Sequence, residues 1–233
     1  MPSLWLGILQ TLKMKTKLFL LISATMLFYS SCSLILMKKA GFEIPKVIAK
    51  EKMLTIAEKN GLLRTHITYT KPTSLNYIKA LNLGFPCAFL FNKSGQLLYF
   101  KNVDNNGCIG GLPVILSQLN ATQHYDTSQK YQLKELYALM VDSNGNSISA
   151  GTDQSQYDFI FISTFSTFYQ KGCKYNQDWE TGIKENKSAK IKYYQFNLDV
   201  LDEWNYASVD SLIKQGYLDY KWYNIGVKFN KLN

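Results

Sequence analysis

The chain has 233 residues, of which 46% are hydrophobic and 14% aromatic. This composition is enough for a packed core and excludes a globally disordered protein, and the length suits one domain of moderate size with additional segments. The formal net charge is +9, but nearly all of the positive charge is lysine, and Arg64 is the only arginine. Because specific nucleic-acid readers depend on arginine for bidentate contacts, we expect a solvated basic surface and no nucleic-acid partner.

The N-terminal segment has the pattern of an export signal. Lys13, Lys15 and Lys17 precede an uncharged, largely apolar run at residues 18–31, and Cys32 follows it. A basic start, an apolar stretch and small residues before a cleavage point are typical of a signal peptide. The sequence "YSSCS" resembles the lipobox of bacterial lipoproteins. By that resemblance Cys32 becomes the lipidated first residue of the mature protein, and membrane lipid is its first partner.

A single-pass signal anchor is the alternative to a lipoprotein signal. Residues 18–37 are long enough to span a bilayer, and Lys38 and Lys39 follow them. The lysines before this run outnumber those after it, which favours a cytoplasmic N-terminus. Both interpretations predict that residues 1–37 target or anchor the protein, and that residues 38–233 form a single α/β domain facing the periplasm. We favour the lipoprotein.

The first half of the body alternates predicted helices and strands. Apolar spacing, capping residues and β-branched runs predict a helix at 45–61, a strand at 62–70, a helix at 74–84 capped by Thr73 or Ser74, strands at 87–91 and 96–100, and a helix at 110–119. The stretch "CAFLFNKSGQLLYF" starts with a strand that is apolar on both faces, as in a central position, and turns at Gly95. We therefore expect a β-hairpin here.

The second half is predicted to be more irregular. Its pattern indicates a loop at 120–132, a strand pair at 133–148, a loop at 149–156, a strand at 157–164, an irregular stretch at 165–173, a helix at 176–188, a strand at 190–200, a helix at 208–216 and an edge strand at 217–230. Helices and strands interleave along the chain, which predicts an α/β protein with a layered sheet and flanking helices.

Two stretches of this pattern resemble the two halves of a thioredoxin-fold domain. Residues 157–200 have a strand, a loop with a cysteine, a helix and a strand, as in the first half. Residues 75–119 have a helix, a Gly-Phe-Pro step, a buried strand, a glycine turn, a strand and a helix, as in the second. In that family the proline before the central strand has a cis peptide bond and lies against the redox cysteines, a role that the resemblance gives to Pro86. The halves occur in reversed order, which implies either that the domain is permuted or that only one of the two stretches is related to the family.

The Cys-x-x-Cys motif of that family is absent. The residues three positions before and after Cys173 are Gln170 and Asn176. Dithiol exchange needs two thiols one helical turn apart, the first with a pKa lowered by the helix N-terminus and the second able to resolve the mixed disulfide. We therefore expect a degenerate thioredoxin-like module without this exchange chemistry.

The body contains three cysteines besides Cys32, so at most one intramolecular disulfide can form. Cys87 and Cys108 are the pair nearest in sequence. Cys87 is interpreted as a small buried side chain of a central strand, and Cys108, in "NNGCIGG", as an exposed and more reactive thiol. Cys173 is expected just before a helix, whose dipole would favour the thiolate. The alternative for Cys173 is a loop thiol without a function.

Other chemistries have weaker signals. His66, in a predicted strand, and His124, in a polar loop, have no histidine or cysteine at ligand spacing, so we expect no metal and no cofactor. Asp199, Asp202 and Glu203 are expected to form a solvated loop.

The sequence thus favours a membrane-tethered protein of the bacterial cell envelope. Its thioredoxin-like module is expected to bind a protein partner or to have a structural role. The alternative is a thiol oxidoreductase or redox sensor that uses Cys173 or Cys108, so enzymatic activity is left open.

Overall fold

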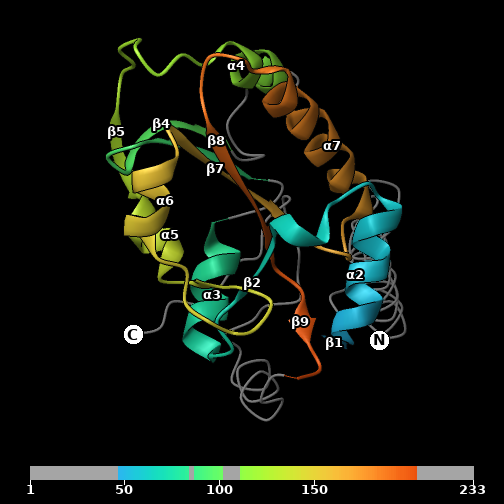
Figure 1. Ribbon diagram of the computed structural model, residues 1–233. Coiled ribbons are helices and arrows are strands. Elements are labelled where there is room, and N and C mark those ends of the chain that lie inside the picture. The colour runs from blue at the N-terminus through green and yellow to red at the C-terminus, as the bar shows by residue number, and fades with distance from the viewer. Residues whose placement is uncertain (1–46, 84–86, 102–110, 204–233) are drawn as a thin grey trace, which may run out of the picture. The chain divides into compact units, whose positions relative to one another are not determined.

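The computed structural model describes residues 47–83, 87–101 and 111–203 (Figure 1). The chain divides into two compact units, residues 1–43 and 44–233, and every described residue belongs to the second. This unit is a mixed α/β structure with a curled seven-stranded sheet and flanking helices, which confirms the predicted α/β class. Within the described part, every helix is too short or too polar to cross a bilayer.

The helices of this unit are short, apart from the last. They are α2 (Lys50–Lys59), α3 (Ser74–Asn82), α4 (Leu112–Gln118), α5 (Leu133–Tyr137), α6 (Ala150–Gln156) and α7 (Gln170–Glu185), together with the 3-10 turn η1 (Arg64–His66). The strands are β1 (Val47–Ile48), β2 (Ile67–Thr70), β3 (Ala88–Asn92), β4 (Gln96–Lys101), β5 (Ser128–Gln132), β6 (Met140–Val141), β7 (Phe159–Phe165), β8 (Ile191–Asn197) and β9 (Val200–Leu201).

The large sheet has the strand order β5-β4-β3-β7-β8-β2-β6. Strands β7, β8 and β2 run parallel to one another, whereas β3, β4, β5 and β6 each run antiparallel to their neighbours. A separate parallel pair joins β1 to β9. The sheet therefore combines a parallel centre with an antiparallel hairpin on one side.

The hairpin formed by β3 and β4 confirms the prediction for this stretch. Its turn is closed by a hydrogen bond of 2.9 Å from Gly95 N–H to the carbonyl of Asn92. Gly95 has φ +77°, a left-handed conformation that glycine adopts without steric strain. Strand β3 lies inside the sheet between β4 and β7, and Phe89 and Leu90 on its two faces are both buried.

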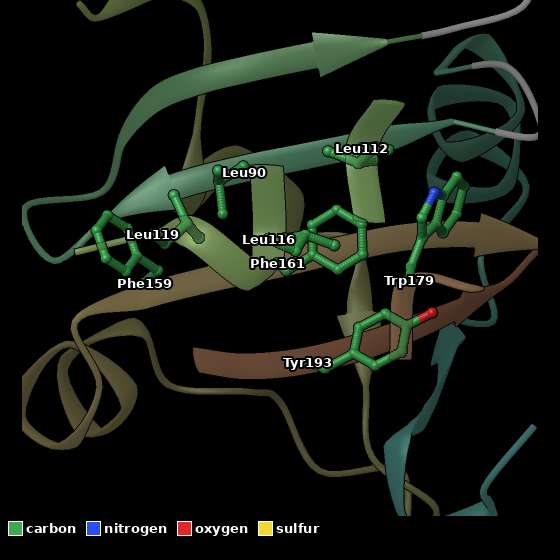
Figure 2. Close-up of a cluster of buried hydrophobic side chains, with 9 residues drawn as sticks. Leu90, Leu112, Leu116, Leu119, Phe159, Phe161, Trp179 and Tyr193 are labelled. Carbon is green, nitrogen blue, oxygen red and sulfur yellow. The ribbon is translucent and has the colours of Figure 1, made fainter. Parts of the chain in front are cut away.

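Helices α4 and α7 cover one face of the sheet (Figure 1). The main apolar cluster lies beneath them (Figure 2) and consists of Ala88, Leu90, Leu112, Leu116, Leu119, Phe159, Phe161, Trp179 and Tyr193. The rings of Phe161 and Trp179 meet edge to face with centroids 5.7 Å apart, a favourable geometry for aromatic pairs. This face holds the side chains of Phe159 and Phe161 from β7 and of Trp179 from α7.

Helices α4 and α7 approach each other closely at one glycine. A Cβ atom on Gly182 of α7 would lie 2.3 Å from the carbonyl oxygen of Pro113 and 2.9 Å from its Cα atom. Because both of these atoms belong to the backbone, they cannot rotate away as a flexible side chain would. The absence of a side chain at Gly182 therefore sets the distance between the two helices.

Helices α5 and α6 supply side chains to the opposite face. Successive residues of a strand point to opposite sides, so Tyr194 of β8 faces away from the cluster that contains Tyr193. The hydroxyls of Tyr194 and of Tyr137 on α5 both donate to the Asp153 carboxylate on α6. This face also buries Phe89, Phe91 and Ile162, so the carboxylate adds a polar contact to apolar packing.

Several sequence predictions in the first half need correction. Helix α2 begins at Lys50, because residues 47 and 48 form strand β1 instead of a first helical turn. Only the second part of the strand predicted at 62–70 is extended, since Arg64–His66 form a 3-10 turn. The cap of α3 is confirmed: Asn76 N–H donates to Thr73 Oγ1 at 3.2 Å.

In the second half the predicted loops contain regular elements. The stretch 120–132 contains edge strand β5, and 149–156 contains helix α6. The strand pair predicted at 133–148 is a short helix, α5, followed by β6, which pairs with β2 and makes one bridge, Val141 to Ser147. Strands β7 and β8 lie where they were predicted. The elements predicted at 208–230 lie outside the described residues.

Candidate functional site

The described residues nearest to the predicted thiol chemistry lie at the edge of the sheet where β7 and β8 end. Strand β3 begins beside the end of β7: Thr164 N–H donates to the Cys87 carbonyl, and Cys87 N–H donates to Thr164 Oγ1, both at 2.9 Å. Helix α7 starts a few residues after β7. Ligand sites of α/β sheets usually lie at the carboxyl ends of parallel strands, so a functional site is expected at this edge.

Cys87 lies at this edge with a buried side chain. Its side chain is 0% exposed, as the sequence interpretation expected. Burial raises the pKa of the Cys87 thiol well above its usual value. Because the thiolate is the nucleophile, a buried thiol with a raised pKa is chemically inert at neutral pH. Cys87 is therefore part of the packed sheet.

Cys173 does not precede a helix, so that prediction is wrong. Helix α7 begins at Gln170, and Cys173 is its fourth residue. The position with the strongest effect of the helix dipole is the start of the first turn, which Gln170 occupies. If this turn corresponded to a dithiol motif, Cys173 would stand at the second position and Gln170 at the first.

One turn further along α7, Asn176 is fully buried against the sheet. Its Oδ1 atom accepts hydrogen bonds from Ser163 Oγ at 2.6 Å and from Tyr193 Oη at 3.1 Å. The two hydroxyls are also 2.9 Å apart. Three oxygen atoms share only two hydroxyl hydrogens here, so two of the three contacts can be hydrogen bonds at one time. The position three residues after Cys173 thus holds a packed polar side chain.

Further polar atoms around Tyr193 have no partner in the described part of the chain. They are Asn176 Nδ2, Gln195 Oε1 and His66 Nδ1. The His66 and Tyr193 rings are 5.4 Å apart, and Gln195 Nε2 is 3.4 Å from Tyr193 Oη. A buried donor or acceptor without a partner costs about 1–3 kcal/mol, and ordered water is the usual partner of such groups.

The electrostatic surroundings of His66 favour its neutral form. Burial lowers the pKa of His66, the Glu180 carboxylate opposes this shift, and Lys192 and Lys184 add to it. Glu180 itself is buried on α7 and forms an ion pair of 2.7 Å with Lys184. His66 was placed in a strand by the sequence, whereas it ends the 3-10 turn η1.

Asp199 is buried at the same edge, so the prediction of a solvated loop is wrong for this residue. It is 1% exposed, whereas Asp202 and Glu203 are exposed as expected. Thr167 donates to it through N–H at 3.0 Å and Oγ1 at 2.8 Å, and Asn197 Nδ2 donates at 2.7 Å. Burial raises the pKa of Asp199, and these hydrogen bonds oppose the shift.

The contacts of Asp199 indicate a structural role. Both carboxylate oxygens accept hydrogen bonds from groups that belong to the loop before α7 and to β8. A general base needs a lone pair that can reach a substrate proton. Asp199 instead fixes the loop between β7 and α7 to the end of β8.

Another buried carboxylate, Asp153, was not predicted by the sequence. Asp153 Oδ2 accepts hydrogen bonds from Tyr137 Oη at 2.7 Å and Tyr194 Oη at 2.6 Å. Burial is the largest cause that raises the pKa of both tyrosines, and the hydrogen bond to Asp153 raises it further. Neither hydroxyl is therefore a ready proton donor at neutral pH. The three residues are far apart in sequence, so no local motif identifies them.

The remaining predicted site residues lie outside the described part of the chain. These are Cys32, Pro86 and Cys108, so lipidation, the proline position and a Cys87–Cys108 disulfide stay predictions. Of Cys173 only the backbone is described. Among the described residues, no three His, Cys, Asp or Glu side chains gather to hold a metal ion.

Comparisons with known proteins give no relative for this chain. No family model matches it, and no significant match exists among curated proteins or solved structures.

Proposed function

We propose that this protein is a membrane-tethered component of the bacterial envelope whose body binds a partner or has a structural role and does not catalyse dithiol exchange. The observation that carries the second part is the position of Cys173 in α7. The helix begins at Gln170, so Cys173 stands at the second position of a dithiol turn and a glutamine occupies the first. Asn176, three residues after Cys173, is buried with two hydroxyls bonded to its oxygen. The burial of Cys87 with a raised thiol pKa also favours a non-catalytic module.

We also propose a permuted thioredoxin-like core. It consists of β7, α7 and β8 from the later stretch and β3, β4 and α4 from the earlier one. In support, the two stretches that resemble the halves of the family pair with each other in one sheet. Strand β3 pairs with β7 along its whole length, and α4 packs against α7 on the same face. Two unrelated segments would not be expected to share both a sheet and a helix layer.

The tether belongs to the proposal through the sequence alone. The basic start, the apolar run and "YSSCS" favour lipidation of Cys32. Replacing Cys32 with serine is expected to abolish labelling by a fatty-acid precursor and to leave a larger precursor protein. If membrane retention and size are unchanged in Cys32→Ser, the protein is held by an uncleaved signal anchor instead.

The absence of dithiol catalysis is tested on the full-length chain in detergent. We expect no reduction of insulin by dithiothreitol beyond the uncatalysed rate, and no thiolate that titrates below about pH 7, compared with an unperturbed value of about 8.5. A purified thioredoxin serves as the positive control. Insulin reduction that disappears in Cys173→Ser or Cys108→Ser would establish the alternative, a thiol oxidoreductase or redox sensor, and overturn the proposal.

A further inference from the structure

A small pocket lies at the turn of the β3–β4 hairpin, away from the edge that holds Cys87. It has a volume of about 240 Å³. The hairpin turn, the loop between α4 and β5, and the start of β7 form its walls. This loop includes the polar stretch with His124 that no element of the proposed function uses.

The floor of the pocket is apolar and belongs to the end of the main core. It contains Leu98, Tyr125 and Phe159. The Tyr125 and Phe159 rings meet edge to face with centroids 5.8 Å apart, and Phe159 is only 3% exposed. Figure 2 shows Phe159 at one end of the core cluster and Trp179 at the other. A bound molecule would therefore contact the partly exposed Leu98 and Tyr125, against which Phe159 packs from the core side.

Hydrogen bonds hold the walls in place. Tyr125 Oη accepts a hydrogen bond from Asn120 N–H at 2.9 Å, which fixes the loop over the core. On the other side, Asn92 Nδ2 donates to Gln96 Oε1 and Asn92 Oδ1 accepts from Gln96 N–H, both at 2.9 Å. The pocket is thus formed before any ligand binds, which lowers the entropic cost of binding.

The rim of the pocket carries side-chain amides from Asn92, Gln96 and Gln123. The Nε2 atoms of Gln96 and Gln123 donate to no other described residue, and both side chains are exposed. An amide offers donors and an acceptor together, and a hydroxyl group does the same. The rim therefore suits a molecule with several hydroxyl groups.

The pocket is lined by charged side chains of both signs. Lys93 brings a positive charge, and Asp158 brings a negative one. One oxygen of Asp158 accepts a hydrogen bond of 2.8 Å from Lys190 N–H, so the carboxylate is held in position. A pocket with both signs of charge does not select a simple anion or cation, because each would meet a like charge.

We propose that this pocket binds a neutral monosaccharide. Its volume is just below the range of about 300–1,000 Å³ for drug-sized ligands, which limits the occupant to about one sugar ring. The apolar floor can contact the C–H face of the ring. The amide N–H groups can donate hydrogen bonds to its hydroxyl oxygens, and the Asp158 carboxylate can accept hydrogen bonds from its hydroxyl groups. This site rests on the proposed function, since it gives the binding module a ligand.

The test is saturation-transfer NMR on the full-length chain with glucose, galactose, mannose and N-acetylglucosamine. The detergent must have no sugar headgroup. We expect at least one sugar to bind with a dissociation constant below about 10 mM, as suits a shallow site. The exposed Ala121 lines the pocket, so Ala121→Phe fills it and is expected to weaken binding at least about tenfold. Gln123→Ala is expected to weaken it about fivefold, the loss of one hydrogen bond.

The control is Gln156→Ala, which removes an exposed amide from α6 and should leave binding unchanged. The site is overturned if none of the four sugars binds, if Ala121→Phe binds as well as the wild type, or if glycine or inorganic phosphate binds in their place. Insulin reduction together with sugar binding would overturn the proposed function and leave this site standing.

Discussion

The two faces of the sheet are stabilised in different ways. The face under α4 and α7 is held by apolar packing and by the close approach of two helices at Gly182. The face under α5 and α6 also buries large apolar side chains, such as Phe89, Phe91 and Ile162, and adds a carboxylate that joins two tyrosine hydroxyls. Added volume is expected to disrupt the first face at Gly182, and loss of the acceptor is expected to weaken the second at Asp153. Each face should therefore fail under a different kind of substitution.

The largest effect is expected at Gly182. Gly182→Ala places a Cβ atom against the Pro113 backbone and should lower the free energy of unfolding by about 3 kcal/mol, because the helices must separate. Denaturant unfolding of the full-length chain measures this. The matched control is Gly151→Ala on α6, where the nearest atom is 4.0 Å away, and where alanine should raise stability by about 0.5 kcal/mol. Equal effects at the two glycines would contradict the difference between the faces.

The next effect is expected at Asp153. Asp153→Ala leaves one buried and one partly buried hydroxyl without their acceptor and should cost about 2 kcal/mol. Tyr194→Phe should cost about 1 kcal/mol. The double variant should cost less than the sum of the two, because the second change removes a group that the first left unpaired. Strict additivity in this double-mutant cycle would show that the carboxylate does not hold α6 through the tyrosines.

A smaller loss of stability is expected at Asn176, which belongs to a polar cluster within the otherwise apolar face under α7. Asn176→Ala removes the acceptor of Ser163 and Tyr193 and should cost about 1.5 kcal/mol. The loss is limited because the two hydroxyls are 2.9 Å apart and can bond to each other. Asp178→Ala on the exposed side of α7 is the control and should change stability by less than about 0.5 kcal/mol. Similar losses at both positions would exclude a role for this cluster.

The smallest effect is a dependence on pH through His66. Since the pKa of His66 is lowered in the folded protein, the unfolded chain binds a proton more readily. The contribution of His66 to stability is therefore present above its ordinary pKa of about 6.5 and is lost as the pH falls through the folded value. Unfolding measured between pH 7 and pH 5 should show a smaller decrease for His66→Gln than for the wild type. If the free energy of unfolding of His66→Gln falls with pH as steeply as that of the wild type and of His124→Gln, this prediction is wrong.

The apolar strands at the centre of the sheet were predictable from the sequence, and the polar elements α6 and β5 were not. The strands β3, β4 and β7 follow from apolar runs and a glycine turn, which are local signals. Helix α6, "AGTDQSQ", has no apolar periodicity, since its contact with the sheet is made by Asp153. Strand β5, "SQKYQ", is an exposed edge strand and therefore has a polar sequence like that of a loop.

The candidate site was predicted only in part for the same reason. The burial of Cys87 followed from its place in an apolar strand. Asp199 resembles a solvated acid, and its burial depends on donors from Thr167, which is distant in sequence. The position of Cys173 was wrong because Gly172 and a polar neighbourhood obscured the first turn of α7. The contact between distant residues decided the case of Asp199, and no local pattern encodes it.

The order of strand pairing has a consequence for how the chain folds. Val47 pairs with Val200, Ile67 with Gln195, and Ala88 with Ser163. Strands from the first half of the chain therefore pair with strands that are synthesised much later. The outermost of these pairs closes a loop of about 150 residues, and such long-range pairing slows folding. The large sheet cannot form completely until residue 197 is available, and the separate β1–β9 pair needs residue 201. During synthesis, strands β1, β2 and β3 are therefore complete long before β9, β8 and β7, with which they pair.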